Sequence, residues 1–276
     1  NLSKYDSAVY YYRIALKNFE AIGDEVLIAR LADLLQVTYM ELRQHDRALV
    51  YGEQAIAVLR NANDPASLSG ALSNAANVRE RLNQHDKALA YLKEALKLAQ
   101  SINYKAHENT ILLNISNIYQ NMLQVDSIKP YSEKAAALSR ELGTPESEAI
   151  AYRGLANYYV FKNDLDAAHK YISLSLDITQ KGNFRREHAS SLKTLGAVLL
   201  AMHRYEESYR VDSEAEVLAD SLMGEEIRNQ TLFLEKQFET EKKEAQIQLQ
   251  QAQLQKKNIL NYILIGGAAA LLIILL

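Results

Sequence analysis

The chain has no cysteine and no tryptophan, and its 276 residues include only three prolines and ten glycines. Without cysteine there is no disulfide, no thiolate nucleophile and no cysteine ligand for zinc. So few helix-breaking residues over such a length favour helices over a turn-rich β fold. The net charge of −3 gives no basic excess, so the composition does not indicate nucleic acid as a partner.

A period of 40 residues runs through most of the chain. An acidic residue starts each period. Two positions later comes a small residue, except for Ile128, and nine positions later another small residue. A Gly or Asn recurs seventeen positions after the acid. The acidic series is Asp6, Asp46, Asp86, Asp126, Asp166 and Glu206, and the other series is Gly23, Asn63, Asn103, Gly143 and Asn183. A fixed period in this range is typical of stacked supersecondary units.

Each series has a physical role in a pair of helices. A carboxylate at a helix start meets unpaired N–H groups and the positive end of the helix dipole. Gly and Asn tolerate the left-handed conformation that ends a helix. Asp64-Pro65 and Thr144-Pro145 are typical of an N-cap followed by proline at the first helical position. The small residues indicate where two helices cross closely.

The pattern predicts an all-α superhelix over residues 1–222, built from five helix pairs after one unpaired helix. The unpaired helix covers residues 5–21, and the pairs are 26–42 with 46–61, 66–82 with 86–102, 106–122 with 126–141, 146–162 with 165–181, and 186–202 with 205–221. Because the first helix lacks its partner and the chain ends inside an apolar run, we expect the natural protein to extend beyond both ends.

These positions resemble the tetratricopeptide repeat over roughly residues 5–222. In that family the first helix carries a small residue and an aromatic residue three positions later, and the second carries two alanines around a bulky residue. The matching residues here are Ser116/Tyr119, Ala156/Tyr159, Ala88-Leu92-Ala95 and Ala8-Tyr12-Ala15.

Four residues depart from the family pattern. Gln36 and Arg79 interrupt the first-helix pattern, and Gly52 and Ser132 interrupt the second-helix pattern. The period of 40 also exceeds the family's usual length of about 34, which implies longer helices.

The resemblance implies that a concave face lined by the first helices binds an extended peptide or a partner helix. The candidate residues, carried over by position, are Ser73, Asn77, Arg81, Asn117, Asn121, Arg153 and Asn157. Arg153 and Asn157, one turn apart, resemble half of the family's carboxylate-binding clamp, whereas Ser190 and Thr194 stand where complementary cations would be. An asparagine row can hydrogen-bond a peptide backbone, or it can simply bridge neighbouring helices.

After Gly224 the repeat pattern ends. Residues 225–258 contain no Gly or Pro and predict a long coiled-coil-like linker helix. Residues 259–276 read ILNYILIGGAAALLIILL and predict a transmembrane helix, since they would span about 27 Å of a ~30 Å hydrocarbon core. Gly266 and Ala270 would let two such helices approach, so we expect a homodimer through the linker and membrane helices.

The string from Leu234 to Glu244, LEKQFETEKKE, resembles the juxtamembrane helix of bacterial tetratricopeptide-containing sensor histidine kinases. This resemblance implies a membrane-bound transducer of a two-component system, with the kinase module beyond Leu276 and the repeats in the periplasm. Lys256 and Lys257 favour the opposite orientation by the positive-inside rule.

Sequence motifs for catalysis do not occur in the chain. The six histidines lack HExxH spacing, and there is no glycine-rich phosphate loop or GxSxG elbow. We therefore expect no catalytic residue, cofactor, metal or nucleic-acid partner for this chain, and a protein or peptide in the groove. The alternatives are a membrane-tethered scaffold, repeats linked to a helix-turn-helix transcriptional regulator, and a soluble peptide receptor.

Overall fold

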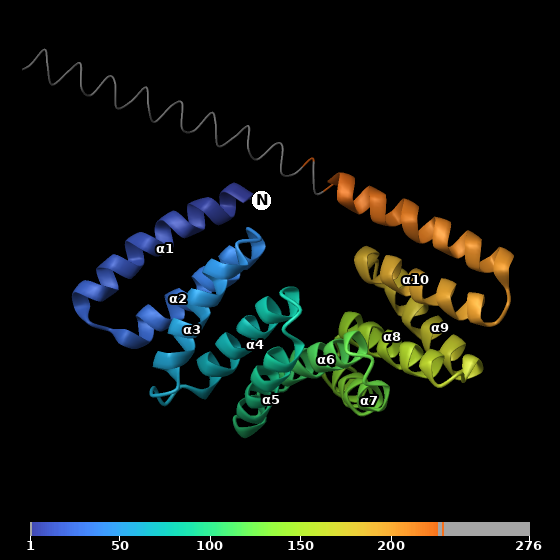
Figure 1. Cartoon of the computed structure of the whole chain (residues 1–276), viewed down its shortest axis with the longest axis horizontal. Coiled ribbons are helices and arrows are strands. Elements are labelled where there is room, and N and C mark those ends of the chain that lie inside the picture. Colours follow the sequence, from blue (N-terminus) through green and yellow to red (C-terminus); the bar gives the residue numbers. More distant parts are fainter. Residues whose placement is uncertain (1, 226–227, 229–276) are drawn as a thin grey trace, which may run out of the picture. The chain divides into compact units, whose positions relative to one another are not determined.

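The computed structural model describes residues 2–225 and residue 228, and the regular elements in that part of the chain are all helices (Figure 1). The repeats belong to one structural unit, Lys4–Glu226. The predicted transmembrane span at 259–276 lies outside the described residues. So does the predicted linker helix at 225–258, apart from residues 225 and 228. Among the helices that are described, none is long and apolar enough to cross a membrane.

The helices follow the predicted pairs to within a few residues. They are α1 (Leu2–Ile22), α2 (Glu25–Glu41), α3 (His45–Leu59), α4 (Pro65–Arg81), α5 (His85–Ser101), α6 (Lys105–Asn121), α7 (Val125–Leu142), α8 (Pro145–Phe161), α9 (Leu165–Lys181), α10 (Arg185–Ala201) and a helix over 205–225. That last helix passes its predicted end at 221 and runs through Gly224. No break in the helix therefore marks the predicted end of the repeats.

Each pair consists of an A helix followed by a B helix, the A helices being α2, α4, α6, α8 and α10. The A helices pack on their own B helices and also on one another, as α2 does on α4 and α8 on α10. Of the six small residues predicted nine positions after the acidic series, Ala15 is half-buried and five are fully buried: Ala55, Ala95, Ala135, Ser175 and Ala215. The predicted close approach of the helices is thus confirmed.

At the centre of each pair, one A-helix residue meets the B-helix residue sixteen positions later, as the Ser116 and Ser132 hydroxyls do at 2.7 Å. A methyl group on Gly52 would overlap the side chain of Gln36, and one on Gly196 would overlap Asp212. The five pairs are Gln36/Gly52, Ala76/Leu92, Ser116/Ser132, Ala156/Ile172 and Gly196/Asp212. In each pair a large side chain faces a small one or two small ones meet, so the crossing is filled without strain.

The fourth departure from the family pattern, Arg79, occupies the place of an aromatic residue. In three other pairs the A-helix tyrosine packs on a B-helix tyrosine, as Tyr39 does on Tyr51 with ring centres 5.4 Å apart. The guanidinium carbon of Arg79 lies 5.1 Å from the ring centre of Tyr91. Arg79 also pairs with Glu53, whose carboxylate accepts the Tyr91 hydroxyl at 2.9 Å. A cation–π contact therefore replaces the ring pair.

A residue with positive φ, in the left-handed backbone conformation, ends most A helices and most B helices. Four of the five predicted positions have positive φ, namely Gly23 (79°), Asn103 (54°), Gly143 (63°) and Asn183 (53°). Asn63 is not among them, and the prediction is wrong there. A second series ends the A helices and was not predicted, because only two of its members are asparagine: Arg43, Asn83, Leu123, Asn163 and His203.

Acidic side chains mark several helix starts. Asp46, Asp86, Asp126 and Asp166 lie in the first turns of their helices, as predicted. The expectation fails for Asp6, because α1 begins earlier, at Leu2.

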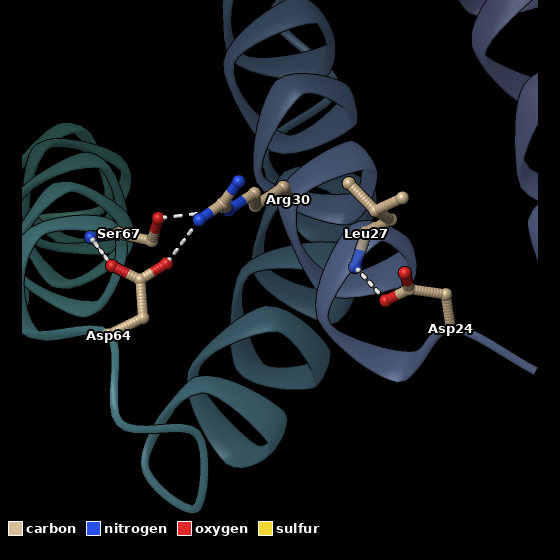
Figure 2. A network of polar contacts seen from close by, with 5 residues as sticks. All are labelled: Asp24, Leu27, Arg30, Asp64 and Ser67. Carbon is tan, nitrogen blue, oxygen red and sulfur yellow. Dashed lines mark hydrogen bonds and ion pairs between the residues drawn. The ribbon is translucent and has the colours of Figure 1, made fainter.

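Asp64 caps α4 and also joins two A helices. Asp24 and Asp64 each accept a backbone N–H three residues later, from Leu27 at 3.0 Å and from Ser67 at 3.1 Å (Figure 2). Arg30 of α2 donates to Asp64 at 2.6 Å, across the space between α2 and α4. The bonds from Ser67 and Arg30 lower the pKa of Asp64 to about 2.

The paired crossing predicts a compensating double substitution. Gly52→Leu alone should destabilise the chain by about 2–3 kcal/mol, because the leucine overlaps Gln36. Gln36→Ala combined with Gly52→Leu recreates the Ala76/Leu92 pair and should recover most of that loss. Urea unfolding of the four chains gives the coupling free energy.

The control is Gly70→Leu, because a Cβ atom added at Gly70 meets nothing within 4 Å. It should not destabilise the chain, and it should raise the unfolding free energy by up to about 1 kcal/mol because leucine favours a helix more than glycine does. A double variant as unstable as Gly52→Leu alone would show that the two residues do not compensate.

Candidate functional site

Polar side chains link neighbouring A helices along one face, which we call the A-helix face. The bonded partners are 37 or 41 residues apart and so come from adjacent repeats. The donor and acceptor pairs are Asn74 to Asp33 (3.0 Å), Asn114 to Asn77 (3.2 Å), Asn121 to Glu80 (3.0 Å) and Asn157 to Gln120 (2.8 Å). Three of the predicted site residues, Asn77, Asn121 and Asn157, therefore bridge helices.

The other four predicted residues have different surroundings. Ser73 is buried, with its hydroxyl 3.4 Å from Nε2 of His107, so it does not present a binding group. Arg81 and Asn117 are exposed, and Arg153 is half-buried. The seven candidates thus share a face but not a common environment.

A polar cavity of about 240 Å³ lies among α6, α7, α8 and α10. It brings together three of the predicted residues, Asn117, Arg153 and Asn157, with Lys193 of α10. The remaining lining residues are Leu113, Ser116, Gln120, Ser132, Ile150, Gly154, Ser190 and Thr194. A methyl group on Gly154 would come within 2.6 Å of the Ser132 hydroxyl. Glycine therefore lets α8 lie close to the serine pair beside the cavity.

Lys193 corrects the expectation that no second cation accompanies Arg153. The complementary cations were expected at the positions of Ser190 and Thr194, and Lys193 lies between these two residues. Lys193 lies 40 residues after Arg153, at the same repeat position, and lines the same cavity. The 40-residue period was the signal that could have found it.

The cavity combines positive charge with hydrogen-bond donors. Burial lowers the pKa of the Arg153 guanidinium, and the negative charge of Glu187 acts in the opposite direction. An arginine stays protonated at neutral pH even so, and Lys193 is exposed to solvent. Two cations beside amide and hydroxyl groups suit a carboxylate or another anion.

Two other cavities lie elsewhere in the array. One of about 640 Å³ lies between α9, α10 and the 205–225 helix, and one of about 370 Å³ lies beside Tyr39 and Tyr51. Neither contains a predicted site residue. In the part of the chain that is described, no group of three or more His, Cys, Asp or Glu side chains is placed to hold a metal ion.

Paired helices that stack in sequence order define a helical solenoid. Residues 69–102, which cover most of α4 and α5, match the family model described as "Tetratricopeptide repeat". The chain therefore carries tetratricopeptide repeats, and proteins of this class bind other proteins or peptides.

Solved structures of other proteins share the fold at low sequence identity. BtubC from P. vanneervenii matches with a TM-score of 0.64 at 18% identity, over 81% of this chain and 91% of that one. Aspartyl phosphate phosphatase F from Bacillus subtilis matches with a TM-score of 0.61 at 15% identity, over 79% and 67%. No curated protein matches the chain in sequence.

A third structure is a signal transduction ATPase with a tetratricopeptide repeat sensor from Pyrococcus horikoshii. It matches with a TM-score of 0.62 at 19% identity, over 71% of this chain but only 31% of that one. At these identities the likeness shows the fold alone.

The cross-links predict that two asparagines at the same repeat position, Asn117 and Asn157, contribute differently to stability. Asn157→Ala removes the bond to Gln120 and should cost about 1 kcal/mol of unfolding free energy. Asn117→Ala, at an exposed position, should change it by less than about 0.5 kcal/mol. Urea unfolding measures both, and equal effects would show that the cross-link does not stabilise the array.

Proposed function

We propose that this chain is the partner-binding, sensory part of a membrane-bound bacterial signal transducer, and that it binds a protein segment rather than catalysing a reaction. The observation that carries the binding role is the cavity that holds Arg153 and Lys193 on the A-helix face. The charged groups of Arg153 and Lys193 lie beside the amide of Asn117 there, and the Asn157–Gln120 bond holds two further amides in the cavity wall.

The chemistry of the cavity identifies the kind of ligand. Arg153 can form two parallel hydrogen bonds to a carboxylate, and Lys193 adds a second positive charge. Asn117 and Thr194 can bond to the peptide groups next to that carboxylate. The ligand is therefore a protein segment with an acidic side chain or a C-terminal carboxylate at the cavity.

The membrane and signalling parts of the proposal are supported by the sequence. Residues 259–276 contain no charged residue and are long enough to approach the thickness of a bilayer core. The string from Leu234 to Glu244 has the composition and position of a juxtamembrane helix in tetratricopeptide sensor kinases. A protein of the same fold is described as having a tetratricopeptide repeat sensor. On this proposal the transducer is a homodimer, and a kinase module follows the membrane helix.

The binding role predicts a charge-dependent interaction. When the full chain in lipid nanodiscs selects from a displayed library of random decapeptides, the selected peptides should be enriched in aspartate and glutamate. Arg153→Gln with Lys193→Gln should weaken binding of the selected peptides at least tenfold, because both cations are removed.

Arg210→Gln is the matched control, since Arg210 is an exposed arginine of the 205–225 helix that bonds to Glu206. It should leave the affinity unchanged. If the selected peptides are not acidic, or if they bind the double variant equally well, the cavity is not the binding site.

The orientation of the repeats can be tested because the chain has no cysteine. Ala57→Cys introduces a single thiol at an exposed position on α3. If the repeats lie in the periplasm, a membrane-impermeant maleimide should label this thiol in intact bacterial cells with a permeabilised outer membrane. Labelling that requires lysis of the inner membrane would place the repeats in the cytoplasm, as Lys256 and Lys257 suggest.

A further inference from the structure

Apolar side chains replace the polar cross-links at the ends of α8 and α10. Glu80 of α4 bonds to Asn121, and Gln120 of α6 bonds to Asn157. The residues at the same repeat position in the next two A helices are Val160 and Leu200, which cannot form such bonds. Beside the cavity, this repeat position on the A-helix face therefore changes from polar to apolar.

The register of the cross-links shows which residues face one another. Bonded partners are 37 or 41 residues apart. The same offsets place Val160 opposite Ala197 and Ala201, and they place Phe161 opposite Gln120, which lines the cavity. Val160, Phe161, Ala197, Leu200 and Ala201 form what we call the apolar patch.

The large side chains of the apolar patch remain in contact with solvent. Phe161 is 46% exposed and Leu200 is 55% exposed. At the corresponding positions α6 carries Asn121 and Gln120, so the repeat does not require a large apolar residue at either place. Packing among the described residues therefore does not account for these side chains, and exposed apolar groups on one face are typical of an interaction surface.

The apolar patch lies at a defined distance from the two cations. Phe161 is eight residues after Arg153 on α8, which is about 12 Å along a helix, and Leu200 is seven residues after Lys193 on α10, which is about 10 Å. An extended peptide covers about 3.3 Å per residue. Three or four residues of an extended segment therefore reach from the cavity to the patch.

We propose that the protein segment bound at the cavity carries a large apolar side chain three or four residues away from its acidic group, and that this side chain sits on the apolar patch. The inference rests on the proposed function. The two cations hold one end of the segment and the apolar patch selects the other, so charge alone does not define the partner. The segment runs along α8 and α10 between these two points.

The test uses synthetic peptides and the full chain in lipid nanodiscs. Each peptide has one glutamate in a glycine-serine background, with one leucine placed one to eight residues before or after it. Fluorescence anisotropy measures the affinity. We expect the tightest binding, at least fivefold better than for the peptide without leucine, when the leucine is three or four residues from the glutamate in one chain direction.

The variant Phe161→Asn with Leu200→Gln introduces the residues that α6 has at the same positions, so the fold should accept it. It should remove the effect of the leucine and keep the effect of the glutamate. Leu174→Gln, at a 39% exposed leucine of the B helix α9, is the control and should change neither effect.

The outcomes separate the two proposals. If leucine improves binding at no spacing, or if its effect survives in Phe161→Asn with Leu200→Gln, the inference is overturned while the cavity keeps its role. If the peptide with glutamate alone binds the wild type no better than it binds Arg153→Gln with Lys193→Gln, the proposed function itself fails.

Discussion

The crossing of the two helices within each pair is the constraint on which the rest of the structure depends. The available space is the same in each repeat, but it is divided differently between the two helices: Gln36 with Gly52, Ser116 with Ser132, and Gly196 with Asp212. Because a close-packed interior tolerates neither voids nor overlap, a change on one helix requires the opposite change on its partner. The crossing geometry can then stay constant while the sequence varies, and this is why bonds between A helices recur at offsets of 37 and 41 residues.

The parts of the fold that local chemistry determines were predictable from the sequence. Asp64 and Pro65 favour a helix start, and Gly143 favours a helix end, because caps act within a single turn. The left-handed turns at Arg43, Leu123 and His203 were not predictable in this way. Arginine and leucine rarely adopt positive φ, so the conformation of Arg43 and Leu123 comes from the packing of the helices on either side of the turn. The compensation of Gln36 by Gly52 was also hidden, since it requires knowledge of which residues meet.

The candidate site was predicted in part, for a related reason. Position on a helix correctly assigned Asn77, Asn121 and Asn157 to the face between A helices, but it does not reveal whether an amide is already bonded to a neighbour. That depends on the neighbouring repeats: the next one offers Asn114 to Asn77, and the preceding one offers Glu80 to Asn121. Lys193 was missed because the complementary cations were expected in the next repeat at the positions of Ser190 and Thr194, and not at the repeat position of Arg153 itself.

The cross-links and the cavity are two consequences of one arrangement. Asn77 and Glu80 of α4 bond to Asn114 and Asn121 of α6, and these bonds hold the two helices in register. Beside the cavity the pattern changes: Gly154 has no side chain, Arg153 meets α10 through the charge of Glu187, and Lys193 is exposed to solvent. A site built this way is already ordered before a ligand arrives, because neighbouring bonds such as Asn157 to Gln120 fix its walls. Binding then costs little reorganisation of the protein, and selectivity depends on whether a segment presents its charge and its apolar side chain at the separation that α8 and α10 impose.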